Sequence, residues 1–433
     1  VHDAQTLTIL QPGDSISLDD CPDIIKLAVL PSVAGQMKVS TRVVASYAHS
    51  CCEQTATKIA ANALAYMGGD GDEKRDAEAA VIAGIRREES MFSSGYGFRM
   101  YPEYNEVNDM WSSLTARRLL SCLPALRDCG NASSDLREAC KRGIKMAQEA
   151  ASIHGIRPDA ISSCHDAYIA VSEGKRLDEA CNFVRGKLEP ESGNRMCVKA
   201  GGRVDMRAET AFAAATLLLA GRDMSTAICA ANWVTEQMNG DGSLHSTVDS
   251  FALIALLGAM SKRGVACAGE SGSRVIVNHE EMSVSDAIKA ADIQSVGLPA
   301  DSEGVLAIQV IRRREENWDQ FLNGARVTAG FKRNGEWVNS LNPGEELDLV
   351  MRIEDGYRVG DLCHICLPPS LSFVFGGGQV KVMAFDPEGK DEIAVPVAVT
   401  SSMRGTQHWA VCLRNMFEEE RGGNPGLQEV SVN

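Results

Sequence analysis

The chain has 433 residues, of which 43 are Lys or Arg and 58 are Asp or Glu, so its net charge at neutral pH is −15. This length predicts two or three domains, and an acidic balance without a basic cluster argues against nucleic acid as a partner. No apolar run is long enough to span a membrane, and a start at Val1 without Met or a signal sequence is expected of a processed protein or an excised fragment.

The cysteine content gives no sign of a disulfide scaffold or a metal centre. Most of the 14 cysteines lie in apolar helical stretches, for example Cys122, Cys140 and Cys181, which is typical of reduced cysteines in a core. Cys363 and Cys366 have the spacing of half a zinc site, but no second pair with that spacing exists. We therefore predict no metal and no cofactor.

The first part of the chain predicts a small β segment followed by a long helical region. Residues 1–20 read as two strands around Pro12-Gly13-Asp14, and two strands need partners, so they are assigned to a flanking β domain. From residue 21 to 262 the periodicity is that of helices of roughly 12 to 18 residues separated by short loops.

Helices of two kinds alternate in this region. The more polar ones are predicted at 24–46, 72–89, 134–151, 176–188 and 223–238, and the ones richer in Ala and Leu at 54–67, 111–123, 166–172, 208–220 and 247–260. Such alternation predicts helical hairpins with one solvated outer and one buried inner helix each. An α/α toroid is the natural arrangement of such hairpins.

The remainder of the chain predicts strands. Residues 263–300 are a mixed connector with a strand at 274–277 and a short helix near 284–291. Strands are predicted at 305–311, 326–331, 346–353, 379–384, 393–399 and 407–413, divided by turns such as Asn342-Pro343-Gly344. The expected fold is mainly α plus β: the α/α toroid followed by an antiparallel β-sandwich at 301–420 and a tail at 421–433.

The residues Cys51-Cys52-Glu53-Gln54 stand where the first inner helix is expected to begin. Residues three apart on a helical turn are neighbours, so the Cys51 sulfur can reach the side-chain amide carbon of Gln54. An internal thioester would form if the sulfur attacked that carbon and ammonia left. A helix N-terminus is expected to lower the thiol pKa and to stabilise the developing oxyanion. Glu53 could assist proton transfer or cap the first turn.

Cys51-x-Glu53-Gln54 followed by Thr55 resembles the thioester motif of the α2-macroglobulin and complement family, and most of all that of the bacterial α2-macroglobulins. Cys52 stands where the family usually has Gly or Leu, and this second thiol could exchange with the thioester or enter a disulfide. The resemblance extends downstream to the runs at 94–102, 111–116 and 241–253. Segments near 304–306, 341–344 and 365–369 resemble the family's C-terminal macroglobulin-like domain.

In an α/α toroid the loops before the inner helices meet at one rim, so we expect several side chains to gather around Cys51 and Gln54. Aromatic residues there would keep water away from a thioester, and a histidine could accept the acyl group and speed its transfer. The candidates for shielding or assistance are Tyr101, Trp111, His165, His245 and, from the terminal domain, Tyr357.

The resemblance implies a fragment of a bacterial protease inhibitor of the cell envelope or extracellular space that serves in host defence. A protease cleaves a bait segment, the thioester is exposed, and a lysine amine of the protease is acylated by Gln54 while Cys51 is released. Such a protein is a self-reacting inhibitor and not a turnover enzyme. Its partners would be target proteases, and its location periplasmic, cell-surface or extracellular.

Two alternatives from other classes stay open. An α/α-toroid enzyme would need clustered carboxylates, for which Glu103, Glu106, Asp109 and Asp249 are the available residues. A binding module could keep the toroid and lack the thioester. The mass of the intact protein separates them, because only a thioester requires the loss of ammonia.

Overall fold

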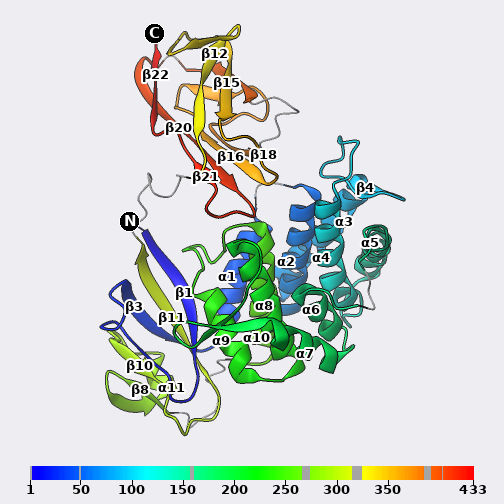
Figure 1. Cartoon of the computed structure of the whole chain (residues 1–433), viewed down its shortest axis with the longest axis vertical. Helices are drawn as coiled ribbons and strands as arrows, with labels where there is room; N and C mark the ends of the chain where they lie inside the picture. The colour runs from blue at the N-terminus through cyan, green and yellow to red at the C-terminus, as the bar shows by residue number, and fades with distance from the viewer. Residues whose placement is uncertain are drawn as a thin grey trace. The chain divides into compact units, whose positions relative to one another are not determined.

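The computed structural model describes residues 2–47, 50–156, 160–265, 274–314, 324–384, 392–401 and 403–433. The chain divides into two compact units, coloured from blue to yellow-green and from yellow to red in Figure 1. The first comprises Val1–Gly201 with Asp205–Arg314, and the second Gly202–Val204 with Glu315–Asn433. Helices and antiparallel sheets are both present, so the predicted α plus β class is confirmed.

The long helices belong to the first unit, and each of the ten helices predicted between residues 21 and 262 overlaps one of them. They are α1 (Ala34–Ala45), α2 (Cys52–Gly68), α3 (Gly71–Met91), α4 (Asp109–Arg127), α5 (Ser134–Ile153), α6 (Cys164–Ser172), α7 (Leu177–Lys187), α8 (Arg203–Ala220), α9 (Met224–Thr235) and α10 (Thr247–Lys262). Two short hairpins, β4 (Phe92–Ser93) with β5 (Gly97–Phe98) and β6 (Leu188–Glu191) with β7 (Arg195–Val198), lie in the connections between them.

Contacts between the helices close into a ring. α2 packs against α1, α3 and α4, α4 packs against α5 and α6, and α10 returns to α1 and α2. α8 connects α6 to α10, because the ring of Phe212 stacks on His165 of α6 at 4.0 Å and lies 5.8 Å from Phe251 of α10. α2, α4 and α10 are buried on most sides, whereas α3 and α5 are buried along one face. For these helices the predicted inner and outer characters agree with the packing. The prediction of a solvated outer helix at 223–238 is wrong, because most residues of α9 are buried.

Side chains fix where the buried helices begin. Asn108 and Ser163 accept hydrogen bonds from the first-turn N–H groups of α4 and α6, and Ser246 forms a capping box with Asp249 at the start of α10. These residue types at helix starts satisfy N–H groups that have no partner within the helix. The starts are therefore determined locally, which is why the sequence predicts them within a few residues.

The strands of the first unit form two small sheets. Their elements are β1 (His2–Leu10), β2 (Ser15–Ser17), β3 (Ile24–Leu30), β8 (Arg274–Val277), β9 (Glu280–Ser283), β10 (Ser295–Gly297) and β11 (Leu306–Arg314), with the short helix α11 (Val284–Ala287) between β9 and β10. The sheet orders are β1-β11-β3 and β2-β10-β8-β9. A common apolar core holds the two sheets together.

Two sequence predictions are wrong in this part of the chain. The expected outer helix at 24–46 is strand β3 followed by the shorter α1, because Ile24–Leu30 pairs with β11 along most of its length. The strand predicted at 305–311 belongs to this sheet and not to the β-sandwich, since β11 also pairs with β1 from Leu306 to Arg314. Both partners are distant in the sequence, and the local pattern carries no sign of them.

Side chains of helix α9 form hydrogen bonds with the free edge of strand β1. The side-chain amide of Asn232 accepts from the N–H of Ile9 at 2.7 Å and donates to its C=O at 2.8 Å. The hydroxyl of Thr235 donates to the C=O of Leu7 at 2.6 Å. An unpaired strand edge is thereby satisfied by helix side chains in place of another strand.

The second unit is a sandwich of two sheets. Its strands are β12 (Val327–Arg333), β13 (Glu336–Val338), β14 (Ser340–Leu341), β15 (Glu346–Ile353), β16 (Asp361–Cys366), β17 (Leu371–Phe373), β18 (Val380–Ala384), β19 (Glu392–Val399), β20 (Gly405–Asn415), β21 (Gly422–Gly423) and β22 (Gln428–Val432). One sheet has the order β13-β12-β15-β19-β17, and the other β14-β22-β20-β16-β18 with β21 beside β20. Their facing side chains form one core, in which Phe331 and Trp409 lie 4.7 Å apart.

The assignment of 421–433 to a tail is wrong. This segment contains β21 and β22, and β22 pairs with β20 on one side and with β14 on the other. Arg421, which precedes β21, is buried and forms an ion pair with Asp361 at 2.7 Å. Glycines and polar residues around Asn424-Pro425-Gly426 conceal these two short strands in the sequence.

We expect Asn232→Leu to lower the free energy of unfolding by about 2 to 4 kcal/mol, because it leaves both backbone groups of Ile9 buried without partners. Urea unfolding followed by circular dichroism measures this difference. The matched control is Asn182→Leu on the exposed face of α7, for which we expect a change within about 0.5 kcal/mol. Equal stabilities of the two variants would contradict the assigned role of Asn232.

Candidate functional site

Cys51 and Gln54 lie at the N-terminus of α2, with Cys51 as its N-cap. The backbone N–H of Gln54 donates to the sulfur of Cys51, and Oε1 of Gln54 accepts from the backbone N–H of Cys51 at 3.4 Å. This reciprocal capping turns the amide side chain of Gln54 back toward the cysteine. Both residues are buried, with 6% and 3% of their surface exposed. The structure therefore brings together the thiol and the amide that the sequence singles out.

Glu53 is fully buried between three helices. Its carboxylate pairs with the guanidinium of Arg118 on α4, and the hydroxyl of Thr247 on α10 donates to both of its oxygens at 2.9 and 3.0 Å. Arg118 also donates to the backbone C=O of Glu53 at 2.9 Å and stacks over the ring of Phe251 at 5.1 Å. Because its carboxylate bonds to Arg118 and Thr247 and its backbone C=O bonds to Arg118, Glu53 holds the first turn of α2 against α4 and α10.

A second buried carboxyl faces the same region from α3. Glu88 is fully buried, and neither of its oxygens has a hydrogen-bond partner in the described part of the chain. Burial raises the pKa of Glu88 well above its usual range, opposed by the charge of Arg87 and reinforced by that of Glu53. Burial therefore favours the protonated form of Glu88, while the carboxylate of Glu53 is paired with Arg118.

The thiol of Cys51 does not have the lowered pKa that the helix N-terminus was expected to give. Burial raises its pKa, the charge of Glu53 acts in the same direction, and the hydrogen bond from the backbone of Gln54 only partly opposes these two effects. The expectation is wrong because it counted the helix terminus and omitted the desolvation of a thiolate. A neutral sulfur is strongly favoured at this position.

Cys52 is fixed by contacts of its backbone and its side chain. Its N–H donates to the C=O of Met100 at 3.1 Å, and its side chain contacts the hydroxyl of Thr115. Burial and the neighbouring Cys51 raise the pKa of its thiol well above the ordinary value. None of the cysteines in the described ranges forms a disulfide. Cys52 is thus a protonated thiol and a poor nucleophile.

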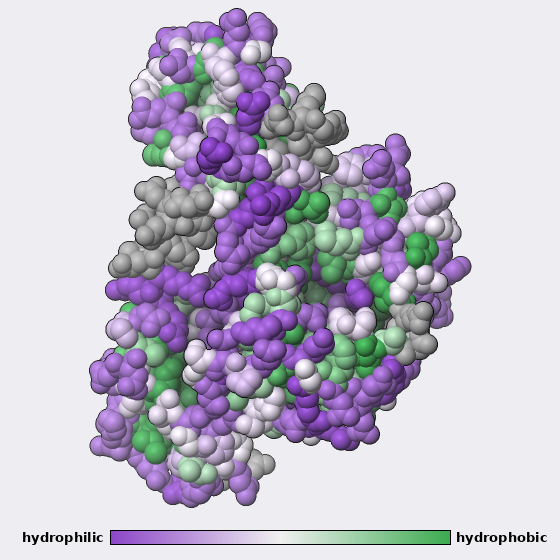
Figure 2. Space-filling view, in the orientation of Figure 1, coloured by the Kyte–Doolittle hydropathy of each residue, from purple (hydrophilic) through white to green (hydrophobic). Residues whose placement is uncertain are grey.

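The loop before α4 covers the start of α2. Tyr101 follows Met100, its phenol pKa is raised by burial and by Cys51, and its ring meets Tyr104 edge-on at 5.3 Å. Trp111 is buried in the first turn of α4. Figure 2 shows hydrophobic surface over the region of α2 and α4, within a unit that is otherwise largely hydrophilic on this face. The influence of Cys51 on its pKa places Tyr101 near the sulfur.

The predicted histidines lie in different settings. His165 is buried in α6, stacked on Phe212, and burial together with Arg117 lowers its pKa to about 3. It is therefore a neutral member of an aromatic cluster with Phe212 and Phe251. His245 is half-buried in the loop that precedes α10. Tyr357 belongs to the second unit, where it is exposed between β15 and β16.

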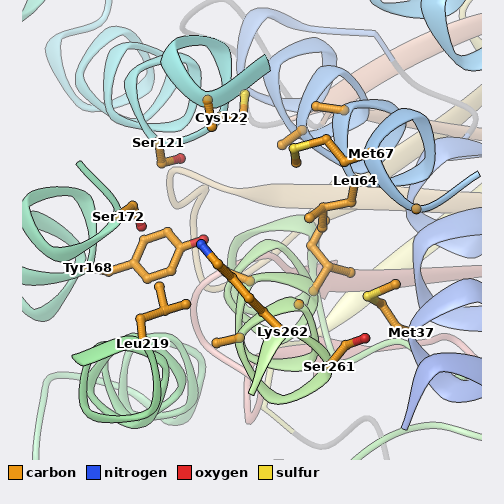
Figure 3. Close-up of a pocket in the computed structure, with 18 of the residues that line it drawn as sticks. Met37, Leu64, Met67, Ser121, Cys122, Tyr168, Ser172, Leu219, Ser261 and Lys262 are labelled. Atoms are coloured by element: carbon orange, nitrogen blue, oxygen red, sulfur yellow. The ribbon is translucent and has the colours of Figure 1, made fainter. Parts of the chain in front are cut away.

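An apolar cavity of about 380 Å³ lies among the helices, away from the N-terminal turn of α2 that holds Cys51. Its walls come from α2, α4, α6, α8 and α10, and include Leu64, Met67, Tyr168 and Leu219 (Figure 3). Phe251, which belongs to both the aromatic cluster and the wall, lies between this cavity and the Glu53–Arg118 pair. None of the residues Cys51, Glu53 and Gln54 lines this cavity, so the cavity is separate from the site at Cys51.

The carboxylates weighed for the enzyme alternative differ in their surroundings. Glu103, Glu106 and Asp109 are exposed, whereas Asp249 is buried and pairs with Arg207 at 2.8 Å. Cys363 is buried and Cys366 exposed on β16, where residues three apart point to opposite faces. Within the described ranges, no group of three or more His, Cys, Asp and Glu side chains could hold a metal ion. Among the described helices, none combines the length and the apolarity needed to cross a membrane.

Comparison with family models finds no match, and comparison with curated proteins finds none either. Among solved structures, Escherichia coli α2-macroglobulin from domain MG7 to the C-terminus matches with a TM-score of 0.55 and 14% identity, over 100% of this chain and 82% of that one. Native E. coli α2-macroglobulin matches with a TM-score of 0.60 and Salmonella α2-macroglobulin reacted with methylamine with 0.57, each at 13% identity over 100% of this chain and 33% of theirs.

These comparisons establish the fold: the chain folds like the C-terminal region of bacterial α2-macroglobulins. It spans about a third of the length of the latter two proteins. At 13 to 14% identity the likeness extends to the fold alone.

Sequence reasoning missed the residues that determine the electrostatics of the motif, namely its partners Arg118 and Thr247 and the nearby carboxyl group of Glu88. Arg118 gave a usable signal, because a charged residue in the middle of a buried helix needs a partner of opposite charge. Thr247 lies within the run 241–253, which resembles the family's sequence, but the sequence assigned it no role. The sequence carries no signal for Glu88, because this residue belongs to a predicted solvated helix with many charged neighbours.

We expect Arg118→Met to lower the free energy of unfolding by roughly 3 to 5 kcal/mol, because it leaves the Glu53 carboxylate buried without a counter-charge. Thermal and urea unfolding measure the loss. The double variant Glu53→Gln with Arg118→Met should lose less than Arg118→Met alone, since no buried charge remains. Arg117→Met is the matched control, because Arg117 on the same helix pairs with Asp166 in a partly exposed position. A loss as large for Arg117→Met would refute the special role of Arg118.

We expect Glu88→Gln to stabilise the protein at neutral and alkaline pH. The raised pKa of Glu88 means that the folded state keeps a proton that the unfolded state releases above about pH 4.5, so stability falls as pH rises from there. Glutamine has the same shape and does not ionise. The difference between variant and wild type should be near zero at about pH 4 and grow by about 1.4 kcal/mol per pH unit above 4.5 until the folded-state pKa is reached.

Urea unfolding at a series of pH values measures this difference. The matched control is Asp76→Asn on the exposed face of α3, which should show no comparable growth with pH. A Glu88→Gln variant that is less stable than wild type at about pH 8 would show that Glu88 is ionised in the folded protein.

Proposed function

We propose that Cys51 and Gln54 are joined by an internal thioester, and that the chain is the thioester-bearing part of a protease trap of the bacterial α2-macroglobulin type. The reciprocal capping of these two residues in a buried helix start is the observation that carries the proposal. The fold shared with bacterial α2-macroglobulins supports it.

Formation of the bond needs no cofactor. The sulfur of Cys51 attacks Cδ of Gln54, a tetrahedral intermediate forms, and ammonia leaves with the thiol proton. The first-turn N–H groups of α2 lie near the developing oxyanion and favour this step. The product is neutral. Replacing a buried thiol by a neutral thioester therefore adds no charge to a site that disfavours one.

The same burial that raises the pKa of Cys51 explains how the thioester could persist. When an amine attacks Cδ of Gln54, the sulfur leaves as a thiolate, and a thiolate that is costly to form is a poor leaving group. Burial and the negative charge of Glu53 both raise this cost. Exposure of the helix start to water would return the thiol toward its ordinary pKa of 9.0 and accelerate cleavage.

The acceptors in this proposal are lysine amines of an attacking protease. His165, neutral and enclosed in its aromatic cluster, is not placed to take over the acyl group. Tyr101 and Trp111 act as part of the cover that keeps water from the thioester. Each acyl group is used once, so the chain acts as an inhibitor and not as a turnover catalyst. Its place of action would be outside the cytoplasm, where proteases of other cells are met.

Methylamine provides the direct test. One structural neighbour is described as reacted with methylamine, and we expect the same small amine to react here. The intact wild-type chain should be lighter than its sequence by one ammonia. Methylamine should add to Gln54, and a thiol at Cys51 should become available for alkylation in step with that adduct. Intact mass spectrometry and peptide mapping measure both changes.

Cys51→Ser should abolish the ammonia loss and the adduct. Cys52→Ser is the matched control, because it removes the adjacent buried thiol and should leave both unchanged. A wild-type chain of full mass whose Cys51 alkylates at once would show that the thioester is absent, and the binding-module alternative would then be favoured.

A further inference from the structure

Lys58 lies one turn beyond Gln54 on α2, on the side that faces Cys51. Its ammonium group donates to the hydroxyl of Ser50 at 3.1 Å, and Ser50 directly precedes Cys51. The side chain therefore runs back along the whole first turn of the helix, past the level of Gln54. The amide oxygen of Gln54 ends on the next residue, at the N–H of Cys51. The amine of Lys58 therefore lies at Ser50 and the side-chain carbonyl of Gln54 at Cys51, which are adjacent residues.

Helix geometry favours the approach of these two side chains. Residues four apart lie one above the other on the same face, and side chains of a helix lean toward its N-terminus. Lys58 consequently leans toward Gln54, the orientation in which a carbonyl side chain at one position and a lysine four residues later pair best. Closing this ring requires rotation of side-chain torsions only, and leaves the helix intact.

The surroundings of Lys58 also favour its neutral form. The side chain is half-buried, and Arg87 on α3 donates to the C=O of Ser50 at 2.9 Å from the neighbouring helix. Burial and the like charge of Arg87 lower the pKa of Lys58 below 10.5. The neutral amine is the nucleophilic form. At a given pH, the neutral fraction is therefore larger for Lys58 than for an exposed lysine.

We propose that Lys58 is an internal acceptor for the acyl group of Gln54, which closes a lactam between the two side chains and consumes the thioester without a partner. This inference rests on the proposed thioester. The neutral Nζ attacks Cδ of Gln54, the bond from Cδ to the sulfur breaks with its electron pair going to the sulfur, and a proton from Nζ is transferred to give the thiol of Cys51. No atom is lost, so thioester and lactam have the same mass.

The consequence is a limit on how long an unused acyl group survives. While Lys58 is held by the hydroxyl of Ser50, its lone pair is not directed at Gln54. Once that hydrogen bond opens, the lysine competes with external amines at an effective concentration that they cannot match. A chain that has met no target then ends as a lactam with a free Cys51 thiol, and no longer acylates bystander proteins.

The test follows the intact 433-residue chain at about pH 9 for the decay of its methylamine-reactive form. Lactam formation gives a product that still lacks one ammonia, does not take up methylamine, and has an alkylatable Cys51. In fragmentation spectra, backbone cleavages between residues 54 and 58 should give no separated fragments, because the lactam holds the two halves together.

Lys58→Arg keeps the charge and the hydrogen-bond capacity but removes the nucleophile, so its methylamine-reactive form should survive about tenfold longer. Lys58→Gln is the second variant in case arginine disturbs the helix start. Lys145→Arg, an exposed lysine on α5, is the matched control and should decay like wild type.

The outcomes separate this inference from the proposed function. If no ammonia-deficient chain is found in wild type or variants, the thioester itself is refuted. If wild type is ammonia-deficient but loses reactivity only by gaining water, or if both Lys58 variants decay as fast as wild type, the thioester stands and the lactam is overturned. Cross-linked 54–58 peptide in wild type, absent from Lys58→Arg, establishes it.

Discussion

The buried ion pair between Glu53 and Arg118 is the interaction on which the geometry of the candidate site depends. It ties the first turn of α2 to the middle of α4, and the hydroxyl of Thr247 ties the same carboxylate to α10. Two charges out of water are costly unless their hydrogen bonds are complete, and here backbone, hydroxyl and guanidinium complete them. The helix start therefore cannot shift without leaving a charge unpaired, so Cys51 and Gln54 keep their mutual positions.

Two carboxyl groups close to one thiol are kept in different states by their surroundings. The carboxylate of Glu53 is paired with Arg118, whereas Glu88 has no hydrogen-bond partner in the described structure and burial favours its protonated form. Burial and the charge of Glu53 disfavour a thiolate at Cys51. The site is thus suited to hold sulfur in a neutral form, which is the opposite of an active-site cysteine prepared as a nucleophile. Within the proposed function, storage is favoured while the site is buried, and reaction is favoured once it opens.

The sequence predictions are accurate where neighbouring residues determine a feature, and they fail where residues far away in the chain determine it. The starts of α4, α6 and α10 were predicted within a few residues, because the capping residues Asn108, Ser163 and Ser246 act on their own helix starts. The errors concern strands. β3, β11 and β22 find their partners far away in the chain, and β11 lies about 300 residues from β1 in sequence. An alternating pattern shows that a segment is extended, but not which sheet it joins.

The sequence by itself determined that a thiol and an amide meet at the start of a buried helix, because that contact spans three residues and depends on local helix geometry. The same reasoning places Lys58 beside Gln54. Only the tertiary structure decided the charge states around them. Arg118 comes from 65 residues away and Thr247 from 194, and burial by the surrounding helices reverses the effect expected of the helix terminus on Cys51. Desolvation and long-range charge pairing depend on what packs around a residue, and no local pattern records that.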